Sequence, residues 1–94
     1  MDNPEAIALL EQELDTFRGN AWSELVGRID LDPVICERLG AGGTKYQLEI
    51  QCVWDARRGG DVRVIGTVDD GGWRAFAPVT RAFIKSADGS FVNE

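Results

Sequence analysis

The chain has 94 residues, 44% of them hydrophobic and 28% charged, and its formal net charge is −6. This length predicts one domain (residues 1–94), and three Trp, four Phe and one Tyr can build its core. Residues 1–40 hold nine acids against three arginines, which accounts for the whole surplus and argues against nucleic acid as a partner. No apolar run reaches the ~20 residues of a membrane span and the N-terminus is acidic, so we expect a cytoplasmic protein without a membrane partner.

Residues 3–18 have the pattern of an amphipathic helix. Asn3 is a good N-cap, and Pro4 suits the first helical position, where no N–H is needed. Apolar residues then recur at helical spacing and form one stripe: Ala6, Ile7, Leu9, Leu10, Leu14 and Phe17. Arg18 followed by Gly19 predicts the end of this helix.

The next segment completes a helical half that we expect to span residues 1–40. Asn20 predicts the cap of a second, short helix, whose apolar face holds Trp22, Leu25, Val26 and Ile29. Asp32 and Pro33 then favour a third helical turn or two, which would carry three apolar side chains inward: Val34, Ile35 and Leu39. The glycine-rich run at residues 40–43 predicts a linker, because its order and the strand after it do not fit a phosphate-binding loop.

Residues 44–94 predict an antiparallel sheet. Apolar and polar residues alternate over residues 44–54, as in a half-buried strand, and residues 55–61 suit a hairpin loop. Two further alternating runs within residues 62–79 flank the turn Asp69-Asp70-Gly71-Gly72, and Asp-Gly between such runs is a strong hairpin signal. Residues 78–81 are expected to turn out of the sheet, before a short fourth strand begins at Phe83.

The two hairpins together predict a register for the strands. In the first hairpin, Trp54, Cys52, Ile50 and Leu48 face Val62, Val64, Gly66 and Val68, in that order. In the second hairpin, Val62, Val64, Gly66 and Val68 face Val79, Ala77, Ala75 and Trp73. Both hairpins place these residues on one face, and a slip of one residue would reverse every side chain.

Helices followed by strands define an α+β fold. We expect an N-terminal helix, with one or two short helices, packed on a curled, mainly antiparallel sheet of three to four strands. The order α-β-β-β-β resembles that of cystatin-like folds, including the cone-shaped nuclear-transport-factor-2-like group. This resemblance lies in the order of the elements, and it implies a helix lying in a curled sheet but no particular function.

The composition offers little catalytic chemistry. The chain has no His, which excludes His-based acid–base catalysis, nucleophile triads and His metal sites. Cys36 and Cys52 form neither a disulfide framework nor a CxxC pair, and we interpret them as small buried hydrophobes. The tight carboxylate pairs suit capping and turns: Asp30 with Asp32, and Asp69 with Asp70. We therefore expect no catalytic residue, metal site or cofactor.

Two groups of residues are candidate sites. On the sheet face away from the helices, an apolar cluster inside a charged border is a candidate interface: Val53, Arg63, Ile65, Arg74 and Phe76. On the face toward the helices, a pair of small residues between large aromatics is a candidate pocket: Tyr46, Trp54, Gly66, Trp73 and Ala75.

These sites support three hypotheses for function. The first is a non-catalytic protein-interaction module, either a homodimer or one partner of a small complex. The second is a small-ligand-binding or simple enzymatic pocket between helix and sheet, although no residue indicates a particular small molecule. The third rests on charge and size and is an immunity-type antagonist of a basic protein.

Overall fold

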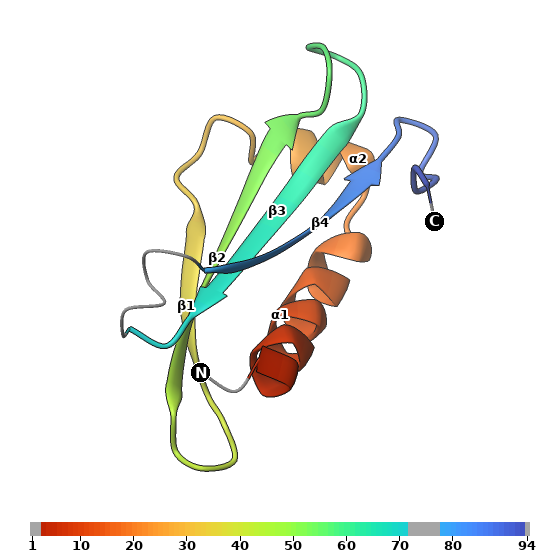
Figure 1. Cartoon of the computed structure of the whole chain (residues 1–94). Coiled ribbons are helices and arrows are strands. Elements are labelled where there is room, and N and C mark those ends of the chain that lie inside the picture. The colour runs from red at the N-terminus through yellow and green to blue at the C-terminus, as the bar shows by residue number, and fades with distance from the viewer. Residues whose placement is uncertain (1–2, 72–77, 94) are drawn as a thin grey trace.

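The computed structural model describes residues 3–71 and 78–93. In this part of the chain two helices precede four strands: α1 (Asn3–Arg18), α2 (Trp22–Val26), β1 (Val34–Leu39), β2 (Lys45–Trp54), β3 (Val62–Asp69) and β4 (Val79–Lys85) (Figure 1). The strands form one antiparallel sheet in the order β1-β2-β3-β4. The sheet is curled and open, and α1 lies across one of its faces (Figure 1). The expected α+β fold with its α-β4 order is confirmed.

The core lies between the helices and the sheet face that they cover, which we call the inner face. Its buried side chains come from both layers: Ala6, Leu10, Leu14, Phe17, Leu25, Tyr46, Leu48, Ile50, Cys52, Val62, Val64, Val68 and Phe83. The predicted pairing of β2 with β3 is confirmed, because Leu48 faces Val68 and Trp54 faces Val62. Alternation fixes this register, since a slip of one residue would expose the buried set.

The expected third helix after Pro33 is wrong. Val34–Leu39 is a strand that pairs antiparallel with β2, and Val34 faces Ile50. The glycine-rich run is the turn of this hairpin, in which the Gly40 N–H donates to the Thr44 carbonyl at 2.8 Å and Gly43 has φ +82°. Residues 34–39 adopt a strand and not a helix because an isolated helical turn is costly to nucleate. The edge of β2, by contrast, has unpaired backbone N–H and C=O groups with which these residues form hydrogen bonds.

The predicted pairing of β3 with residues 73–79 is also wrong. Val79 faces Val68 and Lys85 faces Val62, so the last strand begins where we expected the chain to leave the sheet. Gly66 faces Arg81 instead of Ala75. The observed register places Phe83 in the core, where it is 3% exposed, and this burial outweighs the local preference of the Asp-Gly turn. Residues 72–77, on which the predicted hairpin depends, lie outside the described residues.

The segment after β4 folds back along the same strand. The Ser86 N–H donates to the Ser90 carbonyl at 2.8 Å, and the Val92 N–H donates to the Ile84 carbonyl at 2.9 Å. The Phe91 ring then packs edge-on against Phe83, with 5.8 Å between the ring centroids. The described tail therefore lies at the edge of β4 and packs toward the core.

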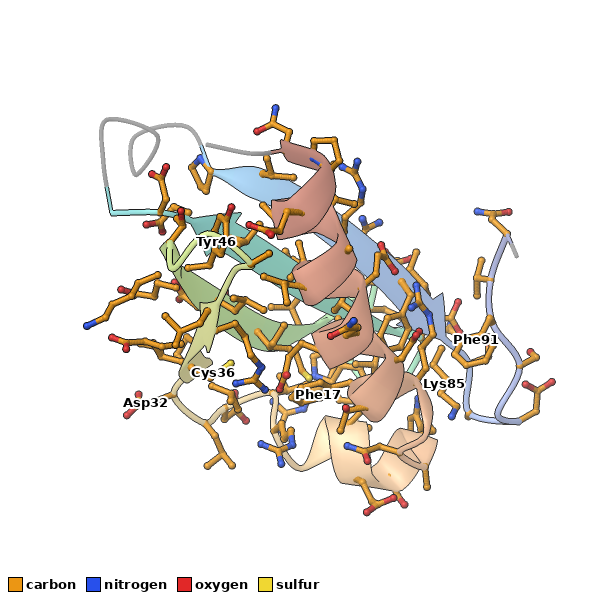
Figure 2. All side chains as sticks on the ribbon, turned by 90° about the horizontal axis from the view of Figure 1, so that it is seen from below. Phe17, Asp32, Cys36, Tyr46, Lys85 and Phe91 are labelled. Carbon is orange, nitrogen blue, oxygen red and sulfur yellow. The ribbon has the colours of Figure 1, made fainter. Side chains whose placement is uncertain are left out.

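Polar contacts fix both ends of α1 to the sheet. At its start, the Tyr46 hydroxyl donates to Glu5 Oε1 at 2.8 Å and the Ala41 N–H donates to Glu5 Oε2 at 2.9 Å. At its end, Lys85 Nζ donates to the Arg18 carbonyl at 3.0 Å. Figure 2 shows Tyr46 and Lys85 near opposite ends of this helix. The helix is thereby held across the sheet at two points about as far apart as its own length.

Candidate interaction surface

The sheet face away from the helices, which we call the outer face, carries side chains from all four strands. Strand alternation assigns it these residues: Ile35, Glu37 and Leu39 of β1; Lys45, Gln47, Glu49, Gln51 and Val53 of β2; Arg63, Ile65, Thr67 and Asp69 of β3; and Thr80, Ala82 and Ile84 of β4. Each of them is exposed or half-buried. The face is therefore accessible and mixes apolar with charged groups.

The predicted interface residues that the structure describes lie together on this face. Val53 faces Arg63 across β2 and β3, and Ile65 lies two residues further along β3. All three are half-buried. The Arg63 guanidinium also pairs with the hairpin loop, because its Nη2 lies 2.7 Å from Asp55 Oδ1. Arg74 and Phe76, the other two predicted members, lie outside the described residues.

Strand β1 adds an apolar surface that the sequence interpretation placed inside the protein. Ile35 is 60% exposed and Leu39 is 67% exposed, so the expectation that they point inward is wrong. Glu37 lies between them on the same face. The neighbouring β-branched residues Val34 and Ile35 favour a strand, but the capping pattern of Asp32 and Pro33 favours a helix start at the same place.

The backbone of β1 is open on one side. Among the described residues this strand pairs only with β2 and forms one edge of the sheet. Gly40 and Thr44 are a hydrogen-bonded pair, and such pairs alternate along an antiparallel ladder. The N–H and C=O groups of Ile35, Glu37 and Leu39 consequently point away from β2, toward the open edge.

The three predicted pocket residues that the structure describes, Tyr46, Trp54 and Gly66, do not line a common cavity. The space above Gly66 is occupied, since a Cβ built there would lie 2.7 Å from Leu10 Cδ1 and 3.2 Å from Leu14 Cδ2. Tyr46 is 1% exposed at one end of β2. Trp54 lies eight residues along the same strand, roughly 26 Å away, and packs on Trp22. Trp73 and Ala75 lie outside the described residues.

Two hollows in the described structure are small or shallow. One of about 10 Å³ beside Phe17 and Cys52 has room for about one water molecule. A shallow depression of about 150 Å³ lies beside Glu37 and has these further residues in its lining: Lys45, Tyr46, Gln47, Asp70 and Gly71. Within residues 3–71 and 78–93 no three metal-ligating side chains lie together, and no described helix is long and apolar enough to cross a membrane.

The two thiols differ in accessibility, which predicts their reactivity. Burial raises the pKa of both Cys36 and Cys52, and Glu13 raises that of Cys36 further. Cys52 is 3% exposed and Cys36 is half-buried. Because only the thiolate is nucleophilic, iodoacetamide at about pH 8 should alkylate Cys36 more slowly than a free thiol, and Cys52 only in denaturant.

Mass spectrometry of timed samples measures both alkylation rates. The Cys36→Ser variant is the control, because it reports Cys52 alone. Rapid alkylation of Cys52 in the folded protein would contradict the burial of the inner face.

No protein-family model matches the chain, and the searches of curated proteins and of solved structures found no match to it. The fold and the surface therefore define only a class, an α+β domain whose open sheet has one face covered by helices. Its distinguishing feature is the outer face with the adjoining open edge of β1, and the functional argument rests on the chemistry of that surface.

Proposed function

We propose that this chain is a non-catalytic protein-interaction module that binds a partner protein through the outer face beside β1. The exposure of Ile35 and Leu39 on an edge strand carries the proposal. Exposed apolar side chains on an open edge invite association, and natural proteins usually shorten, charge or cover such edges. Ile65 and Val53 add apolar side chains elsewhere on the same face, whereas the residues directly opposite Ile35 and Leu39 are Glu49 and Lys45.

Charge favours a different protein over a second copy as the partner. The net charge of −6 makes two copies repel each other and attracts a basic surface. Glu37 adds an acid at the centre of the exposed apolar pair. An acidic antagonist of a basic protein is one form of this proposal. A homodimer is the competing form, and we place the module in the cytoplasm.

The experiment compares proteins that purified baits retain from a lysate. The test bait carries Ile35→Ser and Leu39→Ser, which remove exposed methyl groups without touching the core. The matched control is Leu31→Ser, because Leu31 is 61% exposed but precedes the sheet. We expect one basic protein to bind wild type and the control equally and to be lost from the test bait. That protein is then purified and its affinity for all three baits is measured.

Two results would overturn the proposal. If the same proteins bind all baits equally, the outer face at β1 is not a binding surface. If light scattering finds a wild-type dimer that the double substitution converts to a monomer, the second copy is the occupant and the heterologous partner is wrong.

A further inference from the structure

We infer that the partner adds an extended strand to the open edge of β1, with a basic side chain opposite Glu37 and apolar side chains opposite Ile35 and Leu39. This inference rests on the proposed function and specifies its partner. Three features carry it: the direction of the backbone groups of β1, the side chains beside them, and the charge at the centre of the strand.

The backbone of β1 is suited to accept another strand. Its three residues with outward N–H and C=O groups are spaced two apart, as one antiparallel strand requires: Ile35, Glu37 and Leu39. Peptides that add to a sheet edge gain affinity from this ladder and specificity from alternate side chains. No described strand pairs with this side of β1. The Glu37 carbonyl accepts a hydrogen bond from Arg38 Nη1 at 3.0 Å, and an incoming strand would displace this exposed side chain from it.

The side chains of the same three residues all lie on the outer face. An incoming strand would therefore place every second side chain beside them. The two outer side chains of such a set would lie beside the apolar Ile35 and Leu39, and the middle one would lie beside Glu37. Glu37 belongs to a cross-strand row with Gln47 and Asp69, and the depression of about 150 Å³ lies beside it. That depression lies on the β2 side of Glu37, away from the open edge, and Lys45 also lines it, so the incoming basic side chain would meet Glu37 from the other side.

The same charge disfavours the pairing of β1 with a second copy. In an antiparallel pair of two β1 strands, Ile35 can face Leu39 of the other copy only if both Glu37 side chains face each other. Like charges directly opposite each other are destabilising. A shift of two residues places Ile35 opposite Glu37 and loses the apolar match. A partner strand with a basic residue at its centre and an apolar residue two positions away on each side keeps the apolar match and avoids the repulsion between like charges.

The probe is the synthetic peptide Thr-Leu-Thr-Lys-Thr-Ile-Thr with blocked ends, titrated into ¹⁵N-labelled protein. We expect amide shift changes at Ile35, Glu37 and Leu39, and a dissociation constant lower by roughly fivefold or more than that of the peptide with Glu in place of Lys. Glu37→Lys should reverse this preference. Asp30→Lys is the matched control, because it makes the same charge change at an exposed turn residue and should keep the preference of wild type.

A second peptide tests the hydrogen-bond ladder itself. N-methylation of the lysine and isoleucine removes two N–H groups that would point at β1 and keeps every side chain, so binding should disappear. Undiminished binding of this peptide, shift changes elsewhere, or no binding of any peptide would overturn strand addition. If bait capture still depends on Ile35 and Leu39, only strand addition is wrong. If it does not, the interaction module is wrong as well.

Discussion

Gly66→Val is expected to lower the free energy of unfolding by about 2–3 kcal/mol, because it forces extra methyl groups into a filled core. A Cβ at this position would lie 2.7 Å from Leu10 Cδ1, 3.1 Å from Ile50 Cδ1 and 3.2 Å from Leu14 Cδ2. These three side chains are at most 2% exposed, and protein cores have little free volume into which they could move. Valine adds two methyl groups beyond that Cβ.

Urea unfolding measures the effect, with Thr67→Val as the matched control. Thr67 is the next residue of β3 and lies half-buried on the outer face. The Thr67→Val substitution should therefore change the free energy of unfolding of the protein by no more than about 0.5 kcal/mol. Equal stability of the two variants would show that the space between helix and sheet is not filled. That result would restore the hypothesis of a ligand pocket at Gly66.

A double substitution tests the cause of the destabilisation. Leu10→Ala alone should cost about 2–5 kcal/mol, because it leaves a cavity where Leu10 is fully buried. Adding Gly66→Val should then cost less than it does in the wild type, because its methyl groups occupy that cavity. A coupling energy of about 0.5–3 kcal/mol between the two sites is expected, whereas simple additivity would mean that they do not compete for one space.

Two parts of the fold were predictable because local pattern and burial agree there. Helix α1 begins at Asn3 and has its apolar stripe at helical spacing, and the structure places Leu10 and Leu14 in the core. The β2–β3 hairpin has ten alternating residues in its first strand, so any other register would expose many apolar side chains at once. In both cases a short window of sequence contains most of the stabilising interactions.

The two edge strands were not predictable in the same way, because distant contacts decide them. Pro33 satisfies a helix start locally, yet the free edge of β2 makes Val34–Leu39 a strand. The Asp-Gly signal after β3 favoured pairing with residues 73–79, yet the burial of Phe83 selects the register of β4. The conformation of residues 34–39 and the register of β4 depend on hydrogen-bond partners and burial elsewhere in the sheet, which the local propensity of a segment does not include.

The candidate interaction surface was predicted only where the strands themselves were predicted correctly. Val53, Arg63 and Ile65 were assigned to the outer face because they belong to the well-determined hairpin. The exposed residues of β1 were missed because their strand was interpreted as helix, and one wrong element changes the face of every residue in it. The sequence alone therefore indicated which face is open, while the open edge follows from the structure.

Lys85→Met is expected to lower the free energy of unfolding by about 2–4 kcal/mol, because a buried ammonium ion joins the last strand to the end of α1. Lys85 is only 8% exposed. Its Nζ donates to the carbonyls of Arg18 at 3.0 Å and Asn20 at 2.6 Å, and lies 5.1 Å from the centre of the Phe91 ring (Figure 2). A helix C-terminus carries partial negative charge and unpaired carbonyls, which a cation satisfies.

Methionine keeps the length of the side chain but leaves both carbonyls without this donor. It also removes the cost of burying a charge, which offsets part of the loss and keeps the expected effect at a few kcal/mol. Lys45→Met is the matched control, because Lys45 is exposed on the outer face and should change the free energy of unfolding by no more than about 0.5 kcal/mol. Urea unfolding gives both values, and hydrogen exchange should accelerate at the last turn of α1 in Lys85→Met alone. If that variant is as stable as the control, the desolvation of the ammonium cancels its hydrogen bonds, and packing of Phe91 and Phe83 must hold the tail against the helix instead.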